Sequence, residues 1–231
     1  MKPTSIYTYL PKESTIDYEG HISLLMFTAG CNFKCRYCHN PELIPTKKEC
    51  IRSCDLEKIL AHAKENWIDA ISISGGEPTM SPILPDTLHI IKSYGFRIKL
   101  DTQGSFPSTL QSALPYLDTI AMDYKMPIEK LSQLTQTSVS KESINRSLDL
   151  IKDSGVDYEI RTTVVPGLHS VSDMIQICKE ITAAKRFILQ PFVPRNNLPD
   201  PSYQKKPRTP LPLLEKFQTV CKEYIQQVNV R

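Results

Sequence analysis

Three cysteines lie close together in the sequence, Cys31, Cys35 and Cys38, with the spacing C-x3-C-x2-C. A structural zinc site needs four protein ligands, so this set is one short. A [4Fe-4S] cluster held entirely by protein also uses four cysteines. Three thiolates on such a cluster leave one iron with an open position, where a small molecule can bind and be activated. The spacing therefore predicts that these cysteines ligate a [4Fe-4S] cluster.

The other cysteines leave an alternative interpretation open. A zinc loop could be completed by His39, Cys50 or Cys54. We expect Cys50 and Cys54 to pack as ordinary small side chains instead, as we do for two further cysteines on apolar helix faces, Cys178 and Cys221. Seven cysteines is an odd count, and in a reducing compartment the crowding of three in one loop favours metal binding over disulfides.

Composition limits the class of protein. The chain has 231 residues, 40% of them hydrophobic and 23% charged, which suits one α/β domain over 1–231, although the length alone would also permit two small domains. The net charge of +3 is too small to indicate a nucleic-acid partner. No apolar stretch reaches the roughly 18 residues of a membrane span, and the N-terminus lacks an apolar signal core. We therefore expect a cytoplasmic protein without membrane association.

Strand and helix patterns alternate about six times along the chain, which predicts a parallel sheet with right-handed crossovers. Polar motifs follow nearly every strand, and this favours an incomplete TIM-like (βα)6 barrel over an open doubly wound sheet. We expect the barrel core over about 20–193, polar irregular chain over 1–20, and an irregular segment and helix over 194–231. The expected strands are 22–27, 70–74, 96–100, 119–122, 158–165 and 187–190, and the expected helices are 55–66, 83–94, 108–114, 138–153, 171–182 and 213–228.

A glycine pair follows the second expected strand, in the run Gly75-Gly76-Glu77-Pro78. Glycines let a backbone approach a ligand closely, although such a pair alone is most often a turn. Its place one strand–helix unit after the cysteines makes it a candidate ligand-binding turn.

These motifs resemble those of a known family. The cysteine segment, with Tyr37 before its last cysteine, resembles the cluster loop of radical S-adenosylmethionine (SAM) enzymes, and Gly75-Gly76-Glu77 resembles the motif that binds the SAM amino group there. Other segments are similar to glycyl-radical-enzyme activases, and most similar to anaerobic ribonucleoside-triphosphate reductase activating proteins, from about residue 10 to about 194. They are Phe33, His39-Asn40-Pro41-Glu42-Leu43, 100–104, 122–125 and 161–167.

The resemblance implies a radical SAM fold with a [4Fe-4S] cluster and SAM as cofactors. It also implies a glycyl-radical enzyme as protein substrate and a flavodoxin- or ferredoxin-type electron donor. The activity so implied is reductive cleavage of SAM and formation of a glycyl radical on the partner. Two alternatives stay open: a radical SAM enzyme acting on a small molecule or RNA, and a non-catalytic metal-binding module with a closed site.

The resemblance further implies roles for single residues. Asp101 would hold the SAM amino group, and Asp123 and Lys125 would lie near its carboxylate; a strand-end turn or helix cap is the alternative for both aspartates. Arg161 is either a carboxylate clamp or a salt bridge across the barrel. Related formate-lyase activases place a ribose-contacting His two residues after the proline of the last strand. Here Val193 stands there, Gln190 is the candidate replacement, and His169 is expected in a surface loop.

Overall fold

The computed structural model describes residues 2–47 and 49–231, which form two compact units. The first unit contains residues 2–32, 42–47, 49–120 and 143–157. The second contains Phe33–Pro41, Ala121–Glu142 and Tyr158–Arg231. The boundary falls inside the cysteine segment, so Cys31 belongs to the first unit and Cys35 and Cys38 to the second. Each unit is described by itself.

Four strands form the sheet of the first unit. β2 (Ser23–Thr28), β3 (Ala70–Gly75) and β4 (Arg97–Thr102) are parallel neighbours, as their buried apolar runs predict. β1 (Ile6–Ser14) pairs antiparallel with β2. The expectation of irregular chain over 1–20 is therefore wrong. β1 was missed because Ile6 is its single buried residue, so the strand has no apolar face to reveal it; its aromatic and β-branched start was the available signal.

In the second unit, β6 (Asp157–Val164), β7 (Arg186–Pro191) and β8 (Gln227–Val230) are parallel neighbours. β8 corrects the expected helix over 213–228, which ends at Cys221. The last residues extend because the Arg231 N–H donates to the Leu189 carbonyl at 3.1 Å and its guanidinium forms a two-fold ion pair with Glu159, with both distances 2.8 Å. Apolar spacing alone did not separate this strand from the helix before it.

The eight strands are ordered β1 to β8 in one sheet, with β5 (Thr119–Asp123) in the middle of the order. β1 and β8 stand at the two ends of that order, so the sheet of the described residues is open. β1 pairs antiparallel with β2, whereas β2–β3, β3–β4, β6–β7 and β7–β8 are parallel pairs. The predicted α/β class with an incomplete TIM-like barrel is confirmed.

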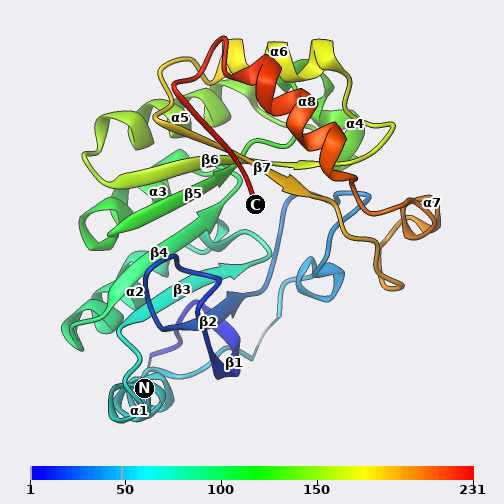
Figure 1. Ribbon diagram of the computed structural model, residues 1–231. Helices are drawn as coiled ribbons and strands as arrows, with labels where there is room; N and C mark the ends of the chain where they lie inside the picture. Colours follow the sequence, from blue (N-terminus) through cyan, green and yellow to red (C-terminus); the bar gives the residue numbers. More distant parts are fainter. Residues whose placement is uncertain (1, 48) are drawn as a thin grey trace. The chain divides into compact units, whose positions relative to one another are not determined.

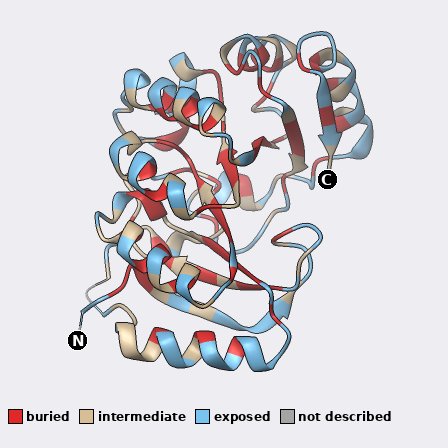
Figure 2. Cartoon of the chain, turned by 90° about the vertical axis from the view of Figure 1, so that its left-hand side faces the viewer, coloured by how far each residue is buried: buried red, intermediate tan, exposed pale blue. Residues whose placement is uncertain are grey.

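The helices alternate with the strands along the chain, and each expected helix is present (Figure 1). Their outer faces are exposed, whereas strands β2 to β7 are largely buried (Figure 2). One short helix, α7, lies in the segment 194–212 that was expected to be irregular. No helix in residues 2–47 and 49–231 is long and apolar enough to span a bilayer. The helices are α1 (Ser53–Glu65), α2 (Leu84–Ser93), α3 (Pro107–Ala113), α4 (Leu131–Thr135), α5 (Lys141–Asp153), α6 (Val171–Glu180), α7 (Pro201–Gln204) and α8 (Leu211–Cys221).

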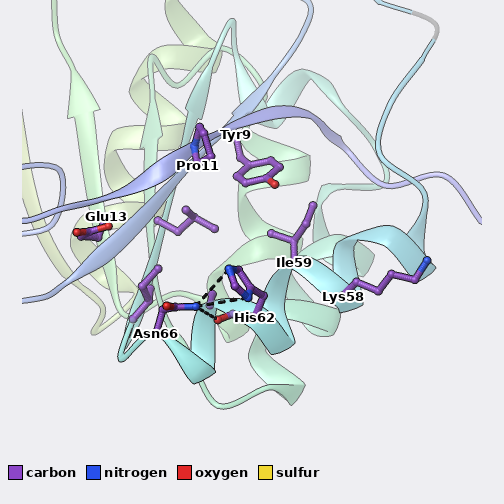
Figure 3. A pocket seen from close by; sticks show the side chains of 10 residues that line it. Tyr9, Pro11, Glu13, Lys58, Ile59, His62 and Asn66 are labelled. Carbon is purple, nitrogen blue, oxygen red and sulfur yellow. Dashed lines mark hydrogen bonds between the residues drawn. The ribbon is translucent and has the colours of Figure 1, made fainter.

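A cavity of about 410 Å³ lies between β1 and α1 in the first unit (Figure 3). Leu24, at the start of β2, lines it, whereas Cys31 follows the other end of that strand. The cavity is therefore separate from the cysteine segment. Its labelled lining residues come from alternate positions of β1 and from one face of α1: Tyr9, Pro11, Glu13, Lys58, Ile59, His62 and Asn66.

Candidate active site

The glycine turn after β3 lies against the backbone that leads into Cys31. Gly75 has φ +131°, and a Cβ there would lie 2.3 Å from the Thr28 carbonyl oxygen. A Cβ on Gly76 would lie 2.2 Å from the Gly30 carbonyl oxygen. The Gly76 N–H donates to the Thr28 carbonyl at 3.1 Å. Glycines are required here because this turn touches residues 28–30, which fixes where the cysteine segment begins.

Gly30 and Cys31 also form main-chain hydrogen bonds with the segment that follows the cysteines. The Gly30 N–H donates to the Leu43 carbonyl at 2.8 Å, and the Cys31 N–H donates to the Ile44 carbonyl at 2.9 Å. Gly30 has φ +99°, a conformation that side chains other than hydrogen disfavour. The backbone on the N-terminal side of the predicted cluster is thus fixed before any ligand binds.

Glu77 is a buried carboxylate that accepts hydrogen bonds from two directions. Its Oε1 accepts from the Thr79 N–H at 3.0 Å, from the Thr79 hydroxyl, and from the Thr102 hydroxyl at 2.6 Å. Its Oε2 accepts from the Gln103 N–H at 2.8 Å. Burial raises the pKa of Glu77 above its usual value, and these hydrogen bonds act in the opposite direction. Glu77 therefore joins the glycine turn to the end of β4.

A polar network next to Cys31 was not assigned from the sequence. Gln103 is 6% exposed, and its Nε2 donates to Asn32 Oδ1 at 2.9 Å and to Ser105 Oγ at 2.5 Å. The Ser105 hydroxyl donates to the same Asn32 oxygen at 3.1 Å. The only signal in the sequence was the place of Gln103 inside the motif 100–104, which gave no role for its side chain.

Asp101, near the end of β4, is paired with a buried lysine. Lys99 Nζ lies 2.9 Å from Asp101 Oδ1 and also donates to the Asp17 carbonyl at 2.8 Å. Lys99 is 6% exposed, so its ammonium needs these acceptors. The predicted contact of Asp101 with a SAM amino group stays a prediction, and the structure adds Lys99 as the neighbouring charge.

In the second unit, Cys35 and Cys38 lie in a segment bound to the end of α4. The Lys34 N–H donates to the Thr135 carbonyl at 2.9 Å, and the Arg36 N–H donates to the Leu134 carbonyl at 3.3 Å. The Cys38 N–H donates to the Cys35 carbonyl at 3.0 Å, which closes a turn between the two thiols. Burial raises the pKa of the Cys35 thiol to about 11, against the opposing effect of the Lys125 charge.

Asp123, at the end of β5, lies between two cations. Its Oδ1 accepts from Arg161 Nε at 2.9 Å, and its Oδ2 accepts from Lys125 Nζ at 3.0 Å. Burial opposes the charged form of Asp123, but the charges of Arg161 and Lys125 outweigh it and lower the pKa to about 2. Burial also opposes the charge of Lys125, but Asp123 outweighs it and raises the lysine pKa. Of the two alternatives for Arg161, a salt bridge is present, with a residue of strand β5.

Aromatic rings surround Tyr37, whose hydroxyl is buried with no hydrogen-bond partner among the described residues. Its ring centre lies 6.2 Å from that of Phe192 and 6.0 Å from that of Tyr203. His39 stacks on Phe192 at 6.0 Å, and its Nε2 lies 2.9 Å from the Val193 carbonyl oxygen. Nε2 of His39 is therefore engaged by a backbone carbonyl, which weakens the hypothesis of a zinc loop completed by this residue.

His169 is buried, so its expected place in a surface loop is wrong. Its Nδ1 accepts the Val165 N–H at 3.0 Å, and its Nε2 lies 2.9 Å from the Lys125 carbonyl oxygen. Since Nδ1 is an acceptor, Nε2 carries the proton of a neutral ring. Burial lowers the pKa of His169. The burial of His169 could not be predicted from the sequence, because its ring binds backbone groups and such contacts leave no sequence pattern.

Gln190 and Val193 lie near the end of β7. Gln190 is half-buried and opposite Thr163 in the register of β6 and β7. Val193 is 39% exposed. The predicted contact of Gln190 with the SAM ribose stays a prediction.

All seven cysteines lie within the described residues, and no disulfide joins any of them. In residues 2–47 and 49–231, no group of three or more His, Cys, Asp or Glu side chains is arranged to hold a metal ion. The chemistry of the donors nevertheless fits an iron–sulfur cluster: three reduced thiols within one short segment, whose backbone is tied down at both ends by the bonds of Gly30, Cys31, Lys34 and Arg36.

The sequence pattern that defines the radical SAM superfamily matches residues 25–180, so the chain belongs to this superfamily. The predicted resemblance is confirmed. Enzymes of the superfamily use a [4Fe-4S] cluster and SAM, and the chain is a radical SAM enzyme.

Individual proteins show a narrower similarity. A Methanocaldococcus jannaschii protein, provisionally named a glycyl-radical enzyme activating enzyme, is 31% identical over 225 residues, which are 94% of this chain and 92% of the relative. The pyruvate formate-lyase-activating enzyme of Clostridium pasteurianum is 26% identical over 182 residues, 74% of this chain and 75% of that enzyme. In fold, the chain resembles SuiB of Streptococcus suis bound to S-adenosylmethionine, with a TM-score of 0.67 and 20% identity. That match covers 87% of this chain and 47% of SuiB, so the chain spans about half of the SuiB length.

Proposed function

We propose that this protein is an activating enzyme that uses SAM to generate a glycyl radical on a partner enzyme, such as an anaerobic ribonucleotide reductase. The observation that carries this proposal is the similarity to an activating enzyme along almost the full length of both chains. The pyruvate formate-lyase-activating enzyme adds support from a second named activase. A flavodoxin- or ferredoxin-type protein in a reducing cytoplasm would supply the electron.

Cys31, Cys35 and Cys38 would hold the [4Fe-4S] cluster. When bound and reduced, the cluster supplies the electron that cleaves SAM to methionine and a 5′-deoxyadenosyl radical. The protein's own task is to bind and orient the molecules involved and to exclude water. Gly75 and Gly76 contribute by fixing the backbone at residues 28–30, immediately before Cys31.

The charges of the second unit suit the carboxylate of SAM. Asp123 is contacted by two cations, Lys125 and Arg161. Lysine and arginine side chains form charge-assisted hydrogen bonds with carboxylates, so both are suited to bind the carboxylate of SAM. The residues proposed to contact SAM are Tyr37, Gly75, Gly76, Glu77, Asp101, Asp123, Lys125, Arg161 and Gln190.

The test is to reduce the protein under anoxia, add SAM and an anaerobic ribonucleotide reductase, and record electron paramagnetic resonance spectra. The expected result is a glycyl radical signal on the reductase. Single Cys→Ala variants at 31, 35 and 38 should abolish it. Cys54→Ala is the matched control, because it removes a half-buried thiol outside the cysteine segment.

Other outcomes would overturn parts of the proposal. Formation of 5′-deoxyadenosine without a glycyl radical on any glycyl-radical enzyme would favour a small-molecule or RNA substrate. One relative, named a probable GTP 3′,8-cyclase, is 26% identical over 170 residues. Its name indicates a small-molecule substrate and so supports this alternative. Loss of metal binding in Cys54→Ala, with zinc as the bound metal, would favour the non-catalytic module.

A further inference from the structure

Arg36, between the second and third cysteines, is bound to Asp200 from the C-terminal part of the chain. Its Nε lies 2.7 Å and its Nη2 2.5 Å from Asp200 Oδ2. The Asp200 N–H also donates to the Arg36 carbonyl at 3.2 Å. The same pair is thus joined through both side chains and main chains, across 164 positions of sequence.

Asp200 is itself fixed at the start of α7. Its Oδ1 accepts the Ser202 N–H at 2.8 Å, which uses the carboxylate oxygen that Arg36 leaves available. Rotation of the Asp200 side chain would break the bonds to Arg36 and to Ser202 together. The Asp200 carboxylate therefore fixes the Arg36 side chain relative to the start of α7.

Tyr203, on α7, covers the same part of the cysteine segment. Its ring is buried, lies 6.0 Å from the Tyr37 ring, and has the Arg36 guanidinium 5.4 Å from its centre. The Leu134 carbonyl, from α4, accepts the Arg36 N–H. The chain between Cys35 and Cys38 is therefore held by contacts with both α4 and α7.

We propose that Asp200 and Tyr203 form a clamp, here called the α7 clamp, that positions Cys35 and Cys38 for cluster ligation. Asp200 and Tyr203 are positioning residues, because they act through Arg36 and Tyr37 and not on the cluster. The inference rests on the cluster assignment of the proposed function and goes beyond it, since it gives a role to the proline-rich segment after β7.

The clamp has an electrostatic consequence. Asp200 compensates the charge of Arg36, a residue that follows Cys35 directly and precedes Cys38 by two positions in the sequence. Removing the carboxylate leaves this segment with one more net positive charge, and added positive charge favours the more negative, reduced state of a cluster. Loss of Asp200 therefore raises the reduction potential and also loosens the turn that holds two ligands.

Global stability separates this role from a structural one. The Arg36 side chain is 41% exposed, and ion pairs with such an exposed partner contribute little to folding because solvent screens them. Asp200→Asn should therefore leave the unfolding midpoint of the chain nearly unchanged while it alters the cluster. If the pair had a purely structural role, Asp200→Asn would lower the unfolding midpoint and leave the cluster unchanged.

The experiment compares the anoxically reconstituted protein with Asp200→Asn, Asp200→Glu and Tyr203→Leu. Asp55→Asn is the matched control, since Asp55 pairs with Arg52 at 3.0 Å on α1. The readouts are the rate of iron release to a chelator, the spectrum of the reduced cluster and its midpoint potential. We expect several-fold faster iron release in Asp200→Asn and Tyr203→Leu, a higher potential in Asp200→Asn, partial rescue by Asp200→Glu, and no change in Asp55→Asn.

Iron release and spectra equal to wild type in both Asp200→Asn and Tyr203→Leu would overturn the clamp and leave the proposed function standing. A wild-type protein that takes up no iron would overturn the proposed function, and the clamp with it. Should Asp200→Asn fail to fold, Tyr203→Leu and Asp200→Glu still decide the proposal, because each keeps one arm of the clamp intact.

Discussion

The Glu77 carboxylate accepts the backbone N–H of Gln103 at 2.8 Å, and this bond joins the glycine turn to the end of β4. Gln103 in turn binds Asn32, the residue after Cys31. A buried carboxylate thus links two motifs that are separated in sequence. These hydrogen bonds give Glu77 a structural role. Experiments can distinguish this role from a direct contact between Glu77 and SAM.

Glu77→Gln should destabilise the metal-free chain by about 1–3 kcal/mol, because an amide NH2 would face either the Gln103 N–H or the threonine donors. The measurement is the free energy of unfolding in urea, with exposed Glu57→Gln on α1 as the control. Unchanged stability together with weakened SAM binding would show instead that Glu77 acts mainly as a ligand contact.

Gly76→Ala should prevent normal packing of the turn, since the new Cβ would lie 2.2 Å from the Gly30 carbonyl oxygen. We expect a loss of about 2–3 kcal/mol and poor cluster incorporation. Gly20→Ala is the control, because Gly20 has φ +80° with nothing within 4 Å of a new Cβ and should cost only about 1 kcal/mol. Equal iron uptake by wild type and Gly76→Ala would contradict the role assigned to this turn.

Asp123→Asn should destabilise the chain by about 2 kcal/mol, because it removes a half-buried carboxylate that both Arg161 and Lys125 contact. The folded pKa of Asp123 is lowered from 3.8 to about 2. Its contribution to stability is therefore present above pH 4 and lost as the pH falls toward 2. Urea unfolding between pH 5 and 2 should show a shallower pH dependence in Asp123→Asn than in wild type. The exposed Asp149→Asn on α5 should retain the wild-type slope.

His169→Gln should remove one source of acid sensitivity. The folded pKa of His169 lies below its usual value of 6.5, so the unfolded chain binds the proton more tightly and stability falls as the pH drops below about 6.5. Gln can accept from the Val165 N–H and donate to the Lys125 carbonyl without titrating. Unfolding free energies at pH 7.5 and 5.5 should therefore differ less in His169→Gln; an unchanged difference would rule out a buried neutral His169.

The parallel strands were predictable because buried runs such as Ala70–Ile73 admit few alternatives. β1 and β8 were not, because an edge strand such as β1 buries little and β8 continues the apolar spacing of α8. Edge strands are held mainly by main-chain hydrogen bonds. Almost any residue can form these bonds, so they leave no pattern in the sequence.

The sequence predicted where the candidate residues lie along the strands but not which side chains they contact. The placement of Asp101, Asp123 and Lys125 at or just after strand ends followed from the alternating pattern. The Arg161–Asp123 contact did not, because it depends on which side chains face each other across two strands. The same reason concealed Arg36 and Asp200, which are brought together by tertiary structure alone. The Lys99–Asp101 contact joins two residues of β4 that are two positions apart, and it was not assigned from the sequence.

The central claim is that Cys31, Cys35 and Cys38 hold a cluster with one iron open to SAM. The most direct measurement is iron and sulfide analysis of the anoxically reconstituted protein, followed by electron paramagnetic resonance of its reduced form with and without SAM. The account predicts about four irons per chain and a signal whose shape changes when SAM is added. A single zinc per chain, or an iron signal that SAM leaves unchanged, would contradict it.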